Sequence, residues 1–114
     1  MPIWTSLSHA INGNLNILDN STGTGEGTSF SLIGGGRCTI EAKGTTSSGS
    51  GAASINIEVS NNGTTWQTAG TIGLTLGTTQ TSDGFAMDAP WLYIRANVTS
   101  ISGTDAKVSV IISA

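Results

Sequence analysis

Cysteine, histidine and charged residues are scarce in this sequence. The 114 residues include one cysteine, one histidine, four basic and seven acidic residues, giving a net charge of −3 at pH 7. A lone cysteine cannot form an intrachain disulfide, and one cysteine with one histidine cannot complete a typical zinc site. The basic residues are scattered along the chain, so we expect binding neither to nucleic acid nor to an anionic membrane.

Export and membrane signals are also missing from the sequence as given. Residues 1–9 (MPIWTSLSH) contain no basic residue and no apolar core, so we expect no secretory signal. No apolar stretch approaches the roughly 20 residues that a membrane-spanning helix needs. Secreted domains of this size often contain disulfides, so the single cysteine favours folding in a reducing cytoplasm.

Four small or polar residue types dominate the composition. The chain contains 17 Thr, 16 Gly, 15 Ser and 8 Asn, about half of its length. Threonine favours strands because its branched Cβ fits a pleated surface, and Gly, Asn and Ser favour turns. A chain of this length forms one domain. The composition therefore predicts one all-β domain of many short strands.

Alternation of apolar and polar residues marks the strands. In residues 53–60 the side chains of Ile55, Ile57 and Val59 share one face, and residues 37–43 and 91–99 alternate in the same way. Further strands are predicted at residues 29–33, 64–69, 71–79 and 106–113, with residues 80–90 as a long connection. Asn62-Gly63 predicts one hairpin, and the SGTD turn at residues 102–105 is expected to join the last two strands in another.

This pattern predicts an antiparallel β-sandwich of the Greek-key or jelly-roll type with about seven or eight strands. Residues 29–114 would form the sandwich. Residues 1–28 are less regular, and they would form either short strands or an extended arm that reaches a partner. Leu15, Ile17 and Leu18 are the best candidates for a short strand within this segment.

The search for catalytic and metal-binding residues gives no site. Cys38 lies on the apolar face of its predicted strand and is expected to be a small buried residue, far from His9. Glu41 and Glu58 lie on polar faces and are expected to be solvated or paired with Lys43 and Arg95. No calcium-binding or phosphate-binding loop motif is present. We therefore expect neither catalytic activity nor a cofactor.

Aromatic residues provide the candidates for an interface. Trp91, Tyr93 and Arg95 alternate with Leu92, Ile94, Ala96 and Val98. If the aliphatic face is the core, the first three side chains point outward together, and such residues are enriched at protein interfaces. Trp91 and Tyr93 could equally cover a sheet edge. In the N-terminal segment the corresponding candidates are Ile3, Trp4 and Leu7.

Residues 54–114 also resemble a known class of protein. The run INIEVS, the turn NNGTTWQTAG, the segment SDGFAMDAPWLYIRANVTSISGT and the final strand KVSVIIS resemble small β-sandwich proteins of tailed-bacteriophage virions, above all capsid decoration (cement) proteins. The resemblance implies a protein on the capsid surface of the virion, made in the host cytoplasm. Its partners would be the major capsid protein and other copies of itself, as a dimer or trimer.

A second resemblance gives an alternative function. The turn leading to Trp66 and the YIR strand are similar to galactose-binding-like jelly rolls, whose loops often bind carbohydrate. The implied role is a host-recognition module of a tail fibre or adhesin, and a tail or neck component is a third possibility. The corresponding ligand-binding candidates lie in residues 61–66 and 83–90 and are Asn61, Asn62, Trp66, Asp83 and Asp88.

Overall fold

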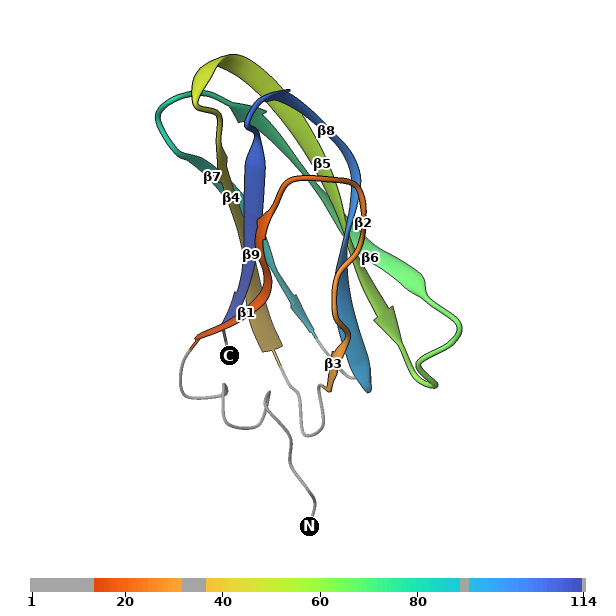
Figure 1. Ribbon diagram of the computed structural model, residues 1–114. Helices are drawn as coiled ribbons and strands as arrows, with labels where there is room; N and C mark the ends of the chain where they lie inside the picture. Colours follow the sequence, from red (N-terminus) through yellow and green to blue (C-terminus); the bar gives the residue numbers. More distant parts are fainter. Residues whose placement is uncertain (1–13, 32–36, 89–90, 114) are drawn as a thin grey trace.

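Nine antiparallel strands make up most of the described part of the chain (Figure 1). The structure is a computed structural model that describes residues 14–31, 37–88 and 91–113. The strands are β1 (Asn14–Ser21), β2 (Gly25–Glu26), β3 (Phe30–Ser31), β4 (Arg37–Thr45), β5 (Ser48–Ser60), β6 (Gln67–Leu76), β7 (Thr81–Asp88), β8 (Tyr93–Thr104) and β9 (Lys107–Ser113). Among the described residues no helix could span a membrane.

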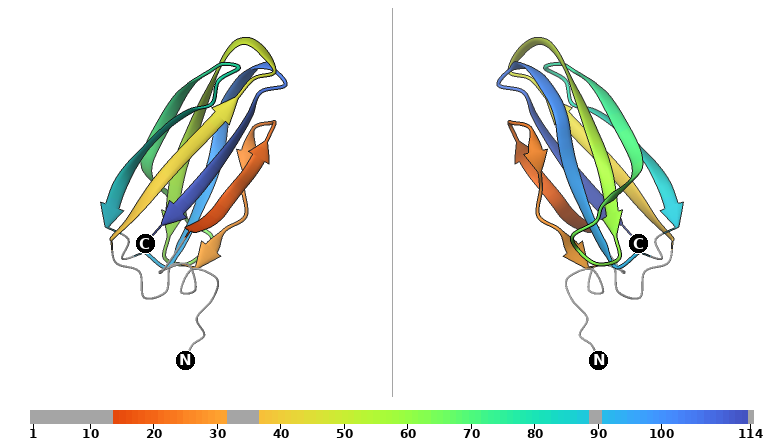
Figure 2. Two further views of the ribbon diagram at one scale, coloured as in Figure 1. Left: turned by 90° about the vertical axis from the view of Figure 1, so that its left-hand side faces the viewer. Right: turned by 90° about the vertical axis from the view of Figure 1, so that its right-hand side faces the viewer.

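The strands form two sheets that face each other. One sheet has the order β1-β9-β4-β7, and the other has the order β2-β8-β5-β6, with β3 also paired to β8. Figure 2 shows the first sheet in front in its left view and the second sheet in front in its right view. The predicted all-β antiparallel sandwich is confirmed, with nine strands in the described residues instead of seven or eight.

The core lies between the two sheets and follows the alternation in the sequence. Ile55, Ile57 and Val59 of β5 are at most 1% exposed, and Ile94, Ala96 and Val98 of β8 are equally buried. Fully burying one such aliphatic side chain contributes about 1.5–3 kcal/mol. Cys38 belongs to this core at 4% exposure, as its place on the apolar face of its strand predicted.

Most connections cross from one sheet to the other, and this corrects one prediction. β5 and β6 form a hairpin within one sheet, as Asn62-Gly63 predicted. The predicted hairpin between the last two strands is wrong, because β8 and β9 belong to different sheets. Asp105 takes a left-handed φ of 50° at the turn between them. The same turn residues occur in hairpins and in connections between sheets, so the composition of residues 102–105 could not distinguish a hairpin from a connection between sheets.

Two strand boundaries also differ from the prediction. Residues 81–88, expected to be part of a connection, form β7 and pair with β4 from Gly44↔Thr81 to Arg37↔Asp88. Phe85 and Met87 are the apolar residues of this edge strand, and both pack partly against the core. The alternation that they form was not recognised in the sequence because Gly84 comes directly before it. The predicted strands 64–69 and 71–79 are one strand, β6.

The N-terminal segment contributes to both sheets. β1 pairs with β9, and β2 pairs with β8 through Gly25↔Val98 and Glu26↔Asn97. Ile17 is 2% exposed and belongs to the core. The described part of residues 1–28 therefore consists of short strands of the sandwich, whereas residues 1–13 lie outside the described residues.

Candidate interaction surface

The outer face of the five-stranded sheet carries a row of charged and polar side chains across three strands. Glu58 of β5 lies directly opposite Arg95 of β8, and Glu26 of β2 lies opposite Asn97. Directly opposed residues have Cβ atoms about 5 Å apart, which is close enough for their side chains to bond. These four residues, with Trp66, are called the Arg95 cluster below.

The Arg95 cluster is held together by charge-assisted hydrogen bonds. Arg95 Nε donates to Glu58 Oε1 at 2.7 Å, and Asn97 Nδ2 donates to Glu58 Oε2 at 3.0 Å. Arg95 Nη2 lies 3.9 Å from Glu26 Oε2. Glu58 is only 8% exposed, so of its two expected environments, solvated or paired, the pairing with Arg95 is confirmed.

Trp66 covers the guanidinium of Arg95. The Arg95 Cζ atom lies 4.1 Å from the centroid of the Trp66 ring, a cation–π contact. Trp66 directly precedes β6 and is partly buried. Arg95 therefore has a carboxylate beside it in the sheet and an aromatic ring above it, so its positive charge is paired within the molecule.

The loop that leads to Trp66 is held by two side chains. The buried Ser60 Oγ accepts hydrogen bonds from the backbone N–H groups of Asn62 and Gly63, at 3.2 and 2.9 Å. Asn62 Oδ1 accepts from the N–H groups of Thr64 and Thr65, at 2.9 and 2.8 Å. Of the Asn-Gly pair only Gly63 has a positive φ, 77°. The hairpin loop therefore spans residues 61–66 and is not a two-residue turn.

A second surface lies at the end of the sandwich where β8 begins. Leu92 is 44% exposed, the one exposed large hydrophobic residue among those described. Its backbone N–H donates to Ser60 O at 3.1 Å. Trp91 packs partly against the core, and Tyr93 lies beside Gly63. These residues, with the neighbouring loop 61–65, are called the Leu92 end below.

The predicted interface residues are therefore divided between different environments. Leu92 was expected in the core and is exposed, because Trp91 and Leu92 precede β8 and the alternation of the strand does not extend to them. Tyr93 is partly exposed, and Arg95 is occupied by Glu58 and Trp66. The candidates Ile3, Trp4 and Leu7 lie outside the described residues.

The predicted ligand residues lie on two different elements of the fold. Asn61, Asn62 and Trp66 belong to the loop before β6, but Asp83 and Asp88 lie on β7, which belongs to the other sheet. Asp83 Oδ1 accepts a hydrogen bond from the adjacent Gly84 N–H at 2.8 Å. Asp88 lies 4.0 Å from Arg37, and both side chains are exposed.

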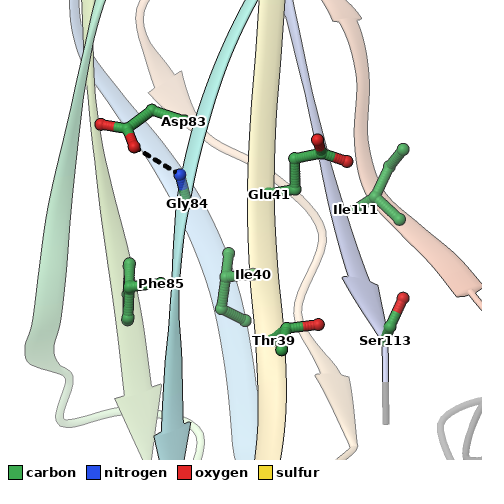
Figure 3. A pocket seen from close by; sticks show the side chains of 8 residues that line it. All are labelled: Thr39, Ile40, Glu41, Asp83, Gly84, Phe85, Ile111 and Ser113. Atoms are coloured by element: carbon green, nitrogen blue, oxygen red, sulfur yellow. Dashed lines mark hydrogen bonds between the residues drawn. The ribbon is translucent and has the colours of Figure 1, made fainter.

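An open hollow of about 370 Å³ lies on the outer face of the four-stranded sheet (Figure 3). Gly84 contributes no side chain to it, and Glu41 and Asp83 lie on either side. A Cβ on Gly84 would collide with the carbonyl oxygen of Ile40, so the close approach of β7 to β4 requires glycine here. No group of three or more metal-ligating residues occurs in the described parts of the chain. The remaining lining residues are Thr39, Phe85, Ile111 and Ser113.

The Cys38 thiol of β4 has an altered pKa. Burial raises the pKa of Cys38, and the nearby Asp88 carboxylate raises it further. Both effects disfavour the thiolate, which is the reactive form of cysteine. The other candidate for nucleophilic chemistry, His9, lies outside the described residues.

This geometry defines the chain as a small sandwich of two antiparallel sheets, and comparison with solved structures agrees. No family model matches the chain, and no curated protein sequence matches it significantly. The SPBc2 prophage-derived protein YomS is similar in fold, with a TM-score of 0.60 and 15% identity over 87% of this chain and 89% of that one.

Two further solved structures are similar. The PBSX exported protein XepA matches with a TM-score of 0.52 and 14% identity over 87% of this chain, which spans only 34% of that protein. A structure described as "CBM4 structure and function" matches with a TM-score of 0.48 and 17% identity over 88% of this chain and 68% of that one. At such identities the similarity to YomS and XepA establishes the fold.

Proposed function

We propose that this chain is a structural protein of a tailed-bacteriophage virion, and that it decorates the capsid by bridging neighbouring subunits of the major capsid protein. The observation that carries the proposal is the similarity in fold to a prophage-derived protein over nearly the full length of both chains. The sequence resemblance of residues 54–114 to virion sandwich proteins supports the same role. The protein acts in this role by adding contact area, without catalysis or a cofactor.

The Leu92 end is the surface that we assign to the capsid contact. An exposed leucine between Trp91 and Tyr93 offers apolar area that a partner can cover, and apolar and aromatic side chains are typical of interface centres. In Figure 1 the start of β1 and the end of β9 lie at this same lower end of the sandwich. The Arg95 cluster is joined to the 61–66 loop through the contact between Trp66 and Arg95.

Binding to capsids that lack the protein tests this assignment. Wild-type protein is expected to cosediment with purified capsids of its own phage assembled without it. Leu92→Asp is expected to lower this binding by about tenfold or more, since burying an unpaired carboxylate in an apolar contact is costly. Ser82→Asp, which adds the same charge at an exposed position on β7, is the control and is expected to bind normally. Absence of wild-type binding would contradict the proposal.

Carbohydrate binding is the second candidate, and the Arg95 cluster is the observation that favours it. The partly exposed indole of Trp66 lies over the Arg95 guanidinium, and the exposed Glu26 carboxylate lies 3.9 Å from the same guanidinium, so the face offers a stacking surface and a hydrogen-bonding group. This function predicts binding to glycans that Trp66→Ala abolishes. A glycan array without signal would exclude carbohydrate binding and would leave the proposed capsid binding in place.

A further inference from the structure

The two sheets end in edge strands, and these edges differ in how they are protected. β1 carries Asp19 and two irregularities in its pairing with β9, and β2 is a two-residue strand that contains Glu26. β7 carries Asp83 and Asp88. β6 (QTAGTIGLTL) is a ten-residue edge strand without a charged residue or proline. Charge, bulges and short length are the usual means of preventing edge-to-edge pairing. β6 has one irregularity in its pairing with β5, between Thr68 and Gly70, but the stretch from Gly70 to Leu76 has neither a charged residue nor a bulge.

Hydrogen bonds from two side chains establish which backbone groups of β6 face outward. Thr81 Oγ1 donates to the carbonyl oxygen of Thr75 at 2.8 Å from outside the sheet. Backbone polar groups in a strand alternate in direction, so Thr71 and Gly73 face the same outer side as Thr75. The Thr99 hydroxyl of β8 donates to the carbonyl oxygen of Ser54, so the backbone groups of Ser54 face β8. The backbone N–H and C=O of the next residue, Ile55, therefore face β6, where Ile55 pairs with Ile72. Both observations assign the same orientation.

Thr71 and Gly73 therefore present N–H and C=O groups that no described residue bonds. Both residues are exposed, and a Cβ built on Gly73 would meet no atom within 4 Å. The right view of Figure 2 shows β6 as the outermost strand of its sheet, beside the edge of the other sheet. On that other edge, β7, the Gly84 N–H is already bonded by the Asp83 carboxylate. The middle of β6 is thus the less protected of the two neighbouring edges.

We propose that a second copy of this chain adds to this edge, with β6 pairing antiparallel to β6 of its partner about a two-fold axis at Ile72. In this register Thr71 lies opposite Gly73 of the partner subunit, and each of the two equivalent pairs exchanges two backbone hydrogen bonds. The two sheets join into one continuous sheet, and their outer faces stay on the same side.

Charge and shape favour a second copy as the occupant. A two-fold axis brings identical residues together, so a strand that carries charge would meet its own charge near the axis. β6 carries none, whereas β7 would bring together its own aspartates. The absence of a side chain at Gly73 leaves space for the threonine that faces it. This dimer forms with or without a capsid, so its failure and the failure of the proposed function are distinguishable.

Sedimentation equilibrium of the full chain tests the proposal. Wild-type protein is expected to be dimeric, and Gly73→Lys is expected to weaken the dimer by about tenfold or more, because two lysines would lie at diagonal positions across the axis. Ala86→Lys places the same charge at an exposed position on the other open edge, β7, and is expected to leave the dimer unchanged. A monomer at all concentrations, or a dimer that only Ala86→Lys weakens, would overturn the proposal.

Amide hydrogen exchange of the wild-type protein provides a second test that needs no variant. The Thr71 and Gly73 amides are expected to exchange more slowly as protein concentration rises, whereas the Ile72 amide, which faces β5, is protected at every concentration. Protection of Thr71 and Gly73 that appears only when capsids are added would identify another protein as the occupant and would exclude the second copy.

Discussion

Arg95 and Glu58 lie directly opposite each other on β8 and β5 and form a 2.7 Å hydrogen bond between Nε and Oε1. Their side chains are only 20% and 11% exposed, although both point to the outer face of the sheet. The pair is shielded by Trp66 and extended by Asn97, so the outer face of this sheet is a fixed network and not a free charged surface.

Loss of the Glu58 charge is expected to destabilise the fold. Glu58→Gln leaves the partly buried Arg95 without its close carboxylate, which should lower the free energy of unfolding by about 1–3 kcal/mol in urea denaturation. Asp88→Asn breaks the exposed 4.0 Å pair with Arg37 and is the matched control. That change should cost no more than about 0.5 kcal/mol. Equal losses for the two variants would contradict this account of the network.

Trp66 is expected to contribute through its contact with Arg95. Trp66→Ala should lower the free energy of unfolding by about 1–2 kcal/mol, because both the cation–π contact and the cover over the guanidinium are lost. Trp66→Phe keeps an aromatic ring and should recover part of this loss. Denaturation of the two variants by urea gives the comparison, and a Trp66→Ala protein as stable as wild type would mean that the ring contributes nothing.

Two exposed glycines are expected to respond oppositely to the same substitution. Gly84→Ala should destabilise by about 1–3 kcal/mol, since the new Cβ collides with the backbone of β4 at Ile40. In the isolated subunit, Gly73→Ala should be neutral or stabilise by about 0.4–1 kcal/mol, because the added methyl group meets no atom of the same chain and the unfolded chain loses freedom. The two thermal midpoints measure this difference, and a fall in both would contradict it.

The buried thiol of Cys38 is expected to make stability fall at alkaline pH. Its pKa is raised in the folded state, so the folded protein holds the proton at pH values where the unfolded chain has released it. The stability contributed by the protonated thiol is therefore complete below the unfolded pKa, about 8.5, and is lost as pH rises above it. Cys38→Ala should flatten this alkaline decline in urea denaturation, and an unchanged pH profile would contradict the assignment.

The core could be predicted from the sequence because its signal is local. Alternation correctly placed Cys38 and Ile40 inside, and the same reasoning identified the inward faces of β5 and β8. β7 escaped prediction because its inward Phe85 and Met87 follow Asp83-Gly84, which has the composition of a turn. Leu92 was wrongly predicted to be buried because the alternation of apolar and polar residues applies only within a strand, and Leu92 precedes the first residue of β8.

The Arg95 cluster could be predicted only in part, because it depends on register between strands distant in sequence. Alternation put Arg95 and Asn97 on one face, and pairing of Glu58 with Arg95 was one of the stated expectations. Glu26 entered the cluster only because β2 pairs with β8, and residues 1–28 were too irregular in sequence for a strand to be placed at Glu26. The crossing at Asp105 was hidden for a related reason, since the choice of sheet is decided by packing and not by the turn residues.

The location of the protein in purified phage particles tests the central claim most directly. Quantitative mass spectrometry would give its copy number, and cryo-electron microscopy would give its place. The proposed function predicts many copies at regular positions on the capsid surface, each in contact with more than one capsid subunit. A few copies confined to the tail or neck, or none in the particle, would contradict decoration and make carbohydrate recognition or a tail role the leading function.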